Sequence, residues 1–312
     1  MGVQILITAL AGGVGASKFL KGLVKIIKPE ELNIIVNTGD DIELYGLHIS
    51  PDIDIVMYTL AGLVDKKKGW GIKKDRFDCL EMLGKYGLEK WFQLGNRDLA
   101  THVYRTYLLK KGVKLSDATM ILCRALNLKV NIYPMSNEKV QTKIVTKTGS
   151  IHFEEYLVKR QARDKVVDVK FEGIENSKPT QGVISSILES NLIILCPSNP
   201  IVSIGPILSV PGIRNALKKT QSNIIGISPI IEGDTIKGPA DKLMRGLGHE
   251  VSSYGVALLY KDILDGFIID NLDRSEKTRI ERLGIKVVTT NTIMKSIKDK
   301  IELAKLVLNL QI

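Results

Sequence analysis

The sequence predicts an α/β protein with a Rossmann-like, doubly wound, mostly parallel sheet, helices on both faces, and an inserted helical and hairpin elaboration. Short apolar runs of strand length alternate with helical patterns in the first third, and this rhythm returns in the second half. The first apolar run ends in glycines that lead into a helix, as in βαβ units. The composition is globular, with 44% hydrophobic and 25% charged residues. We therefore expect residues 1–312 to form a single α/β domain.

The first third predicts a strand–helix–strand unit followed by a second helix. Val3–Leu10 is a continuous apolar run, which is typical of a strand buried on both faces. Apolar residues recur at helical spacing over 17–27, and the next apolar run, 32–37, is the second strand. Pro51 disfavours helical geometry in the residue before it, so we expect a helix to open there and to include 55–64.

The second half predicts strands and helices in alternation. The apolar runs of strand length are 191–200, 222–231, 266–273 and 285–292. Helical patterns follow them at 212–220, 238–248, 275–284 and 293–310. The last of these helices is expected to cap the sheet or to serve a dimer contact.

The interval from about 65 to 171 has a different texture and is expected to be an elaboration between the two halves of the sheet. Residues 116–128 predict a helix with Ser116 as its N-cap. Residues 141–158 alternate in polarity around a Thr148–Gly149 turn, which is typical of a β-hairpin.

Composition excludes several classes of protein. Lys and Arg exceed Asp and Glu by 44 to 34, but only 5% of residues are aromatic, so a small polyanion is favoured over nucleic acid as a partner. The spacing of Cys79, Cys123 and Cys196 indicates neither a zinc site nor a disulfide framework. The first apolar stretch lacks a basic leader and runs into glycines, which argues against a signal peptide and a membrane span. We expect a cytoplasmic protein.

A glycine-rich turn follows the first predicted strand. Gly12, Gly13 and Gly15 stand where a Rossmann phosphate loop would be, beside the free amides of a helix N-terminus. Their spacing differs from G-x-G-x-x-G and lacks the Lys-Ser/Thr ending of a P-loop, which disfavours a nicotinamide-dependent oxidoreductase. The alternative is that these glycines only permit a tight turn.

Four acids follow the second predicted strand. Asp40 and Asp41 come directly after it, at the sheet edge where open α/β folds bind ligands, and Asp52 and Asp54 follow ten residues later. Magnesium takes one or two carboxylates together with phosphate oxygens and water, so acids near a phosphate loop fit metal-assisted phosphoryl transfer. Taken singly, such residues are more often turn formers or first-turn helix carboxylates.

Two further polar segments are candidates for the site. Arg97 has the charge to neutralise a phosphate, although an Arg-Asp pair such as Arg97–Asp98 is more often structural, and His102 alone is weak evidence. A buried-looking strand ends in Ser198 and Asn199, in a small polar loop suited to a nucleobase or ribose.

Six segments resemble, in order, the 2-phospho-L-lactate transferase family of coenzyme F-420 biosynthesis. They are "AGGVGASKFLKGL", "VNTGDDIELYGLHISPDIDIVMYTLAG", "GWGIKKD", "WFQLGNRDLATH", "CPSNPIVSIGPIL" and "SPIIEGDTIKGPADKLM". The resemblance implies transfer of a phospholactyl, phosphoenolpyruvyl or phosphoglyceryl group from a guanosine diphosphate-linked donor. The acceptor would be the terminal ribityl hydroxyl of the deazaflavin Fo, and GMP would leave. It also suggests a homodimer.

The resemblance implies roles for residues of this chain. The expected nucleotide-binding residues are Gly12, Gly13, Gly15, Ser198, Asn199, Ser203 and Gly205. The expected magnesium ligands are Asp40, Asp41 and Asp52, and the expected catalytic residues are Asp52, Asp54 and Arg97. The expected Fo contacts are Asp54 with the ribityl chain, Gln93, Trp70 and Gly71, with Gly69–Gly71 as a lid and the elaboration 65–171 as part of the acceptor site.

One position departs from the family pattern. The family has "LGDRD" where this chain has "LGNRD", so Asn96 cannot supply the carboxylate of the first acid. A regulatory protein of the same fold that binds a sugar nucleotide or dinucleotide is the main alternative, and it would not need the paired acidic motifs.

Overall fold

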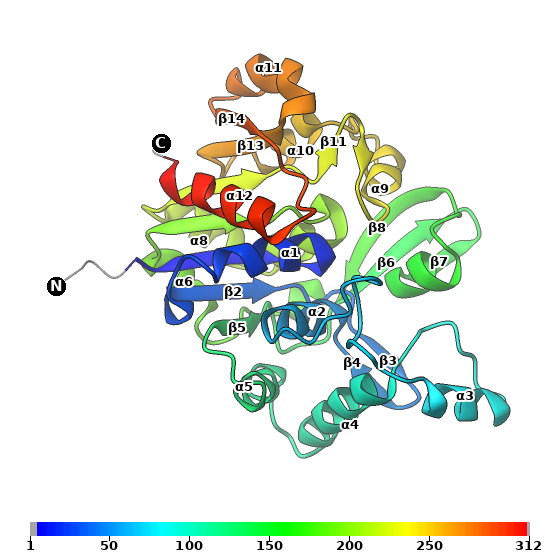
Figure 1. Ribbon diagram of the computed structural model, residues 1–312. Helices are drawn as coiled ribbons and strands as arrows, with labels where there is room; N and C mark the ends of the chain where they lie inside the picture. The colour runs from blue at the N-terminus through cyan, green and yellow to red at the C-terminus, as the bar shows by residue number, and fades with distance from the viewer. Residues whose placement is uncertain (1–4, 311–312) are drawn as a thin grey trace.

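The computed structural model describes residues 5–310, and its centre is a seven-stranded, fully parallel sheet (Figure 1). The strand order is β14-β13-β10-β9-β1-β2-β5. The strands are β1 (Ile7–Ala11), β2 (Leu32–Val36), β5 (Asn131–Pro134), β9 (Leu192–Leu195), β10 (Asn223–Ile227), β13 (Gly266–Asp270) and β14 (Lys286–Thr290). This order confirms the predicted doubly wound α/β fold.

The chain reverses its direction of travel across the sheet between β1 and β9. From β1 it adds β2 and β5 on one side, and it then returns to place β9 against the other side of β1. In open α/β sheets, such a reversal leaves a crevice at the carboxyl ends of the two central strands. The loops after β1 and β9 therefore meet at the predicted place for a ligand.

Helices cover both faces of the sheet. One face carries α1 (Gly13–Leu23), α2 (Pro51–Leu60), α5 (Leu115–Ala125) and α12 (Ile297–Asn309). The other face carries α6 (Val183–Glu189), α7 (Gly205–Ser209), α8 (Ile213–Lys219), α9 (Ala240–Gly246), α10 (Ser253–Tyr260) and α11 (Lys277–Glu281). Along β1, Ala9 and Ala11 belong to the first core and Leu10 to the second, so both faces of the strand are buried.

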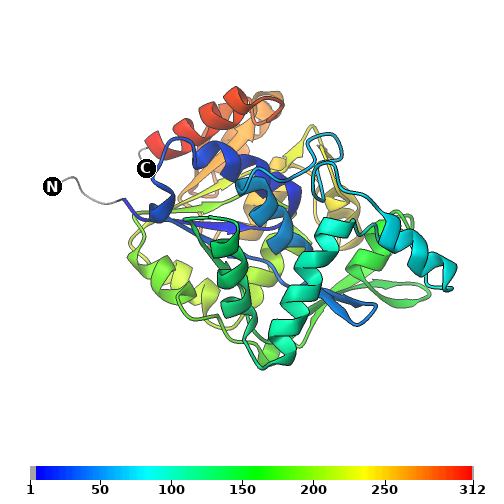
Figure 2. The ribbon, with the colours of Figure 1, turned by 60° about the horizontal axis from the view of Figure 1, so that its bottom comes forward.

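The remaining elements project from the carboxyl edge of the sheet, toward the right in Figure 2. They include a three-stranded antiparallel sheet, β7-β6-β8, formed by β6 (Gln141–Thr146), β7 (Gly149–His152) and β8 (Val166–Glu172). The others are α3 (Asp78–Lys85), α4 (Asn96–Lys110), and the hairpins β3 (Ile42–Leu44)–β4 (Leu47–Ile49) and β11 (Ile230–Ile231)–β12 (Asp234–Thr235). Across residues 5–310, no helix has the length and apolarity needed to span a membrane.

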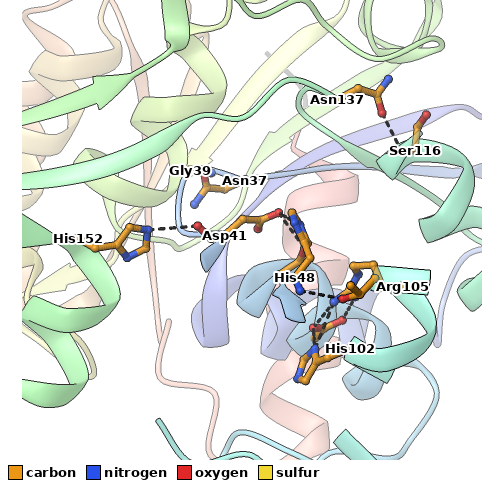
Figure 3. A network of polar contacts seen from close by, with 12 residues as sticks. Asn37, Gly39, Asp41, His48, His102, Arg105, Ser116, Asn137 and His152 are labelled. Carbon is orange, nitrogen blue, oxygen red and sulfur yellow. Dashed lines mark hydrogen bonds and ion pairs between the residues drawn. The ribbon is translucent and has the colours of Figure 1, made fainter. Parts of the chain in front are cut away.

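Some expected boundaries are wrong. The first strand begins at Ile7, because Ile7 is the first residue that finds partners in both Leu32 and Leu192; Val3 and Gln4 lie outside the described residues. Ser116 is not an N-cap: Lys114 holds that place, and Asn137 Oδ1 accepts the Ser116 backbone N–H at 2.9 Å (Figure 3).

Two expectations for the middle of the chain also need correction. The second hairpin strand ends at His152, and 153–159 is helical rather than a continuation of the alternating strand. The interval 65–171 includes β5, which pairs with β2 at the edge of the main sheet, so the elaboration is not one uninterrupted insertion.

Candidate active site

The glycines after β1 lie against the loop after β9, and each has close neighbours. The Ser198 hydroxyl donates to the Gly12 carbonyl oxygen at 2.8 Å, and the Gly12 N–H points back to the same hydroxyl at 3.4 Å. A Cβ on Gly12 would lie 2.6 Å from the Ser203 Cβ, and one on Gly15 would lie 2.0 Å from the Pro197 carbonyl oxygen. Close packing between the two loops therefore excludes side chains at Gly12 and Gly15.

The loop after β9 begins a helical turn with its own cap. Asn199 Oδ1 accepts the backbone N–H groups of Ile201 and Val202 at 3.0 and 3.3 Å. Ser203 is buried, and Gly205 packs against the ring of Phe171. The loops that carry the residues predicted to bind the nucleotide meet at Gly12, Ser198 and Ser203, whereas Gly205 lines a cavity beside Phe171. The side chains of Ser198 and Asn199 are committed to contacts within the protein.

Asn37, at the end of β2, links three of the loops. Its Nδ2 donates to Asp52 Oδ2 at 2.9 Å and to the Val202 carbonyl oxygen at 3.1 Å. Its Oδ1 accepts the Gly39 N–H at 2.8 Å. Asn37 was not selected from the sequence, although its place between a buried strand and two acids was a usable signal.

Three buried carboxyl groups, those of Asp40, Asp52 and Glu154, lie near Asn37 and near one another. Burial, followed by repulsion from Asp52 and Glu154, raises the pKa of Asp40 well above its ordinary value. Burial raises the pKa of Asp52 to about 7, and burial together with repulsion from Asp52 raises the pKa of Glu154 to about 8. Asp40 Oδ1 is buried without a hydrogen-bond partner among the described residues. Glu154 was missed by sequence reasoning because it follows β7, far from the acidic motifs.

Asp41 is held by two histidines from different elements (Figure 3). Its Oδ2 contacts His48 Nε2 at 2.9 Å and accepts the Ser50 hydroxyl at 2.8 Å. His152 accepts the Glu154 N–H at Nδ1, so its Nε2 carries the proton and donates to the Asp41 carbonyl oxygen at 3.2 Å. Burial lowers the pKa of His152 to about 4, which keeps this ring neutral.

Asp54 lies in a buried ion pair with Arg105 of α4 (Figure 3). Arg105 is 0% exposed; its Nη1 donates to Asp54 Oδ2 at 3.0 Å, and its Nη2 contacts Asp54 Oδ1. His102 bridges onward, with Nδ1 3.6 Å from Asp54 Oδ2 and Nε2 3.3 Å from Asp98 Oδ1. Tyr58 donates its hydroxyl to Asp98 at 2.8 Å. Arg105 carried no recognisable sequence signal, because it stands in an ordinary amphipathic helix.

A small pocket lies at the outer end of this chain of contacts. Its lining residues are Lys68, Trp70, Gly71, Ile72, Asp75, Phe77, Gly95 and Asp98. The Lys68 ammonium lies 5.1 Å from the centre of the Trp70 ring and 4.4 Å from that of Phe77. Two predicted acceptor residues, Trp70 and Gly71, are therefore connected to Asp54 through Asp98 and His102.

The other two predicted residues of this region are exposed. The backbone N–H of Arg97 donates to Asp75, and its guanidinium forms no ion pair within the described part of the chain. Gln93 lies outside the pocket lining and donates its side-chain amide to the Lys90 carbonyl oxygen at 2.9 Å. Asn96 bridges to α3, accepting the Cys79 N–H and donating to Asp78, a contact that a carboxylate there would turn into repulsion.

A cluster of lysines lies around α1 and the first turn of α12. Burial lowers the pKa of Lys21, Lys300 and Lys237, and neighbouring ammonium groups lower each of them further. Lys237 reaches from the β11–β12 side to the Lys68 carbonyl oxygen at 3.3 Å. No ion pair between described residues involves Lys18, Lys21, Lys66, Lys73, Lys237 or Lys300. This lysine cluster supplies uncompensated positive charge.

The carboxyl groups fit a divalent cation that takes its remaining ligands from a substrate. Between residues 5 and 310, no three His, Cys, Asp or Glu side chains are arranged to hold a metal by themselves. Asp40 and Asp41 each present a buried Oδ1 without a hydrogen-bond partner among those residues. Burial raises the pKa of both, and repulsion raises that of Asp40 further, so a bound cation would stabilise both carboxylates. Magnesium completes its shell with phosphate oxygens and water, so two carboxylates are sufficient.

Comparison with known proteins gives consistent matches over nearly the whole chain. The model of a family described as 2-phospho-L-lactate transferase CofD matches residues 7–303. The 2-phospho-L-lactate transferase of Methanocaldococcus jannaschii is 41% identical over 303 residues, covering 96% of each chain. A phosphoenolpyruvate transferase of Kitasatospora aureofaciens is 40% identical over 311 residues, covering 97% of each.

The fold also matches solved structures whose sequences are much less similar to this chain. A crystal structure of a UPF0052 family protein from Bacillus halodurans superposes with a TM-score of 0.68 at 15% identity, covering 98% of this chain and 99% of that one. At this identity the match supports the fold alone.

Proposed function

The chain belongs to the 2-phospho-L-lactate transferase family and is a transferase of coenzyme F-420 biosynthesis, and from this premise we propose how its crevice performs the transfer. Family membership implies two substrates, the deazaflavin Fo and a nucleotide-linked donor. The observation that carries the assignment of the site is Asn37, which joins the acidic loop, α2 and the loop after β9 in one hydrogen-bonded unit.

We place the guanosine diphosphate part of the donor in the crevice between the loops after β1 and β9. Backbone N–H groups at the start of α1 suit phosphate oxygens. The lysine cluster adds the positive charge that a diphosphate attracts. Because Ser198 and Asn199 are engaged within the protein, we assign the loop 198–205 to recognition through its backbone and its shape.

We place Fo over the mouth of the pocket lined by Trp70, Gly71 and Asp98, because the pocket itself, at about 10 Å³, is too small for the fused rings, and we direct its ribityl chain toward Asp54. The face of Trp70 suits a flat heterocycle, and the pocket connects to Asp54 through His102. Both oxygens of Asp54 are held by Arg105, so we assign Asp54 to orienting the ribityl chain rather than to accepting a proton. Gln93 remains a predicted contact at the rim.

In the transfer, the terminal ribityl oxygen forms a bond to the phosphorus that carries the three-carbon group. The bond from this phosphorus to the bridging oxygen breaks, and GMP leaves with that oxygen. We assign the hydroxyl proton to Asp52, because its buried carboxyl group lies against the glycine loop at Gly12 and Gly13, beside the proposed phosphate position. Arg97, whose guanidinium has no ion-pair partner in the described residues, would offset phosphoryl charge.

Asp40 would be the principal ligand for magnesium, with Asp52 beside it. When bound there, magnesium would offset negative charge on the phosphoryl group being transferred. We assign Asp41 a secondary role, because His48 and Ser50 already occupy its Oδ2.

The test is to incubate the protein with Fo, magnesium and each guanylylated donor (phospholactyl, phosphoenolpyruvyl or phosphoglyceryl) and to follow the mass of the deazaflavin. A gain of one phosphoryl-linked three-carbon unit with release of GMP is expected for at least one donor. Asp52→Asn should abolish it, while Asp262→Asn, at an ion pair on the surface, should not. Retention of full activity in Asp52→Asn would refute the proposed site.

Three further features remain proposals. A single domain whose elaboration completes the acceptor site is supported by the pocket lining, and the cytoplasmic location rests on the sequence. A homodimer is implied by the family resemblance, and the native mass from light scattering measures it.

A further inference from the structure

Two segments from opposite halves of the main sheet meet at one side chain. Lys237, in the loop between β12 and α9, donates from Nζ to the Lys68 carbonyl oxygen at 3.3 Å. Lys68 belongs to the segment 65–71, which follows α2. Within residues 5–310, no other hydrogen bond or ion pair joins this segment to the loop 235–238. Lys237 therefore links the side of the crevice that carries β2 to the side that carries β10.

Each of the two segments is a turn held by its own hydrogen bonds. Asp65 Oδ1 accepts the backbone N–H groups of Lys67 and Lys68 at 2.8 and 3.2 Å. On the other side, the Thr235 hydroxyl donates to the Gly238 carbonyl oxygen at 2.8 Å. Because both turns keep their own bonds, the hydrogen bond of Lys237 can align one turn with the other.

The ammonium of Lys237 has unused donors and a neighbour of the same charge. An ammonium carries three donors, and Lys237 is exposed and uses one on a neutral carbonyl oxygen. Partial burial lowers the pKa of Lys237, and repulsion from Lys18 lowers it further. No ion pair between described residues involves either lysine. Both ammonium groups are thus available to an anion.

Lys18 connects this pair of charges to the start of α1. It lies one helical turn after Val14 and Gly15. Side chains in a helix lean toward its N-terminus, so the Lys18 side chain is directed toward the glycine turn where we place the donor's phosphates. A diphosphate at the start of α1 would therefore lie beside two unpaired lysines.

Lys68 carries the link onward to the acceptor pocket. Its ammonium lies 5.1 Å from the centre of the Trp70 ring and 4.4 Å from that of Phe77, and all three residues line the pocket over which we place Fo. The same residue thus offers its carbonyl oxygen to Lys237 and packs its side chain on the pocket's rings. A firmer hold on this carbonyl would order the pocket.

We propose that Lys237, together with Lys18, binds the donor's diphosphate and, through the Lys68 carbonyl oxygen, fixes the lid at Gly69–Gly71 over the acceptor. The inference rests on the proposed function, because it takes the donor to lie at the start of α1. One ammonium can donate to a phosphate oxygen and to the carbonyl oxygen at the same time. Donor binding thereby strengthens acceptor binding, and by linkage Fo strengthens donor binding by the same factor.

Fluorescence of Trp70 tests the movement of the lid. The chain has two tryptophans, so Trp91→Phe leaves Trp70 as the single reporter. In this background, GDP with magnesium is titrated while calorimetry measures binding, and a saturable change in Trp70 emission should accompany the heat. Lys237→Met should weaken GDP binding about tenfold, as expected for loss of a hydrogen bond to a charged group, and should show no emission change at saturating GDP.

Lys242→Met is the matched control. Lys242 also donates from Nζ to a carbonyl oxygen, that of Ala162 at 2.8 Å, and it forms no ion pair between described residues. This variant should keep both the affinity for GDP and the emission change.

Equilibrium dialysis of Fo measures the coupling itself. Without GDP, the wild type and Lys237→Met should bind Fo with similar affinity, because a hydrogen bond of 3.3 Å is long and weak. Saturating GDP should tighten Fo binding to the wild type about threefold or more, the contribution of one net hydrogen bond, and should leave Lys237→Met unchanged.

The outcomes separate this inference from the proposed function. If GDP binds but changes neither Trp70 emission nor Fo affinity, the coupling is wrong while the placement of the donor stands. If Lys237→Met behaves as the wild type does, Lys237 is not the linking residue. If the wild type does not bind GDP at all, the inference and the donor site fail together, and the mass assay alone decides whether the protein is a transferase.

Discussion

Mutation can separate the structural role of the Asp54–Arg105 ion pair from the proposed role of Asp54 in orienting the ribityl chain. Asp54→Leu leaves a buried arginine uncompensated and should lower the free energy of unfolding by about 3–5 kcal/mol. The double variant Asp54→Leu/Arg105→Met replaces the pair with apolar groups and should recover much of that loss. Transfer to Fo should be absent in both variants. Denaturant unfolding and the mass assay measure the two effects.

The double variant separates the two roles. If it is stable and also transfers the phosphoryl group at a normal rate, Asp54 has no role beyond folding. Asp262→Asn provides the comparison for a carboxylate in an exposed pair with Arg214, where a loss of about 1 kcal/mol or less is expected.

The three carboxyl groups Asp40, Asp52 and Glu154 predict an unusual dependence of stability on pH. Their pKa values are raised in the folded state, to about 7 for Asp52 and about 8 for Glu154, so the folded protein retains protons that the unfolded chain releases above about pH 4. Stability from this cluster should therefore be present at low pH and be lost as pH rises toward 8, by up to about 1.4 kcal/mol per pH unit for each group. Magnesium should restore it.

The measurement is denaturant unfolding between pH 5 and pH 8.5 in the presence of a chelator, with and without added magnesium. Because other groups also titrate, the informative quantity is the difference in free energy of unfolding between the wild type and Asp52→Asn. The free energy of unfolding of Asp52→Asn should fall less steeply with pH than that of the wild type, and it should not respond to magnesium. If the wild type instead becomes more stable relative to Asp52→Asn as pH rises, the raised pKa assigned to Asp52 is wrong.

At the residue scale, the sequence revealed the acids but not their partners. Asp40 and Asp52 follow a buried strand and a helix start, both of which are local signals. Glu154 and Arg105 reach the site only through the elaboration, and no spacing along the chain encodes that approach. Asn37 is intermediate: it lies next to the acidic motif in the sequence, but no spacing or residue pattern marks it as a functional residue.

At the scale of the elements, α1 is fixed at its two ends by glycines with different neighbours. A Cβ at Gly15 would collide with the Pro197 carbonyl oxygen at 2.0 Å, and one at Gly22 with the Lys300 carbonyl oxygen at 2.3 Å. Each Ala substitution should cost about 1–3 kcal/mol of stability through overpacking. Only Gly15→Ala displaces the crevice loop, so only this variant should lose transferase activity per folded molecule.

Thermal unfolding and steady-state rates at a temperature where both variants are folded would test this. Equal loss of activity in Gly22→Ala would mean that the effect comes from general destabilisation rather than from the position of the loop.

The elements that were predicted correctly have strong local patterns, such as the apolar runs of β1, β9 and β13. The N-cap at Ser116 failed because Asn137, from a later loop, already accepts its N–H. β5 was missed because a four-residue strand at a sheet edge is too short to show a period.

At the scale of the whole molecule, part of the net charge of +10 is concentrated in the lysine cluster. Charges brought together from α1, α12 and two loops would attract a diphosphate over a distance that salt shortens to about 10 Å at 0.1 M ionic strength. The association rate constant of GDP should therefore fall about tenfold between low and high salt.

The double variant Lys21→Gln/Lys66→Gln should make this rate constant less dependent on salt. Lys129→Gln should not, because Lys129 pairs with Glu30. Stopped-flow measurements give the rates, and an unchanged slope in the double variant would contradict this role.

The pairing of α1 with α12, side by side in Figure 1, bears on how the chain is made. The outer side of α1 is covered where Gly22 meets Lys300, in a helix that the ribosome produces long after Leu23. β1 likewise waits for β9 before its second edge is paired. A nascent chain thus holds an apolar helix and an open strand edge for most of its synthesis, and these are the surfaces on which a chaperone would act first.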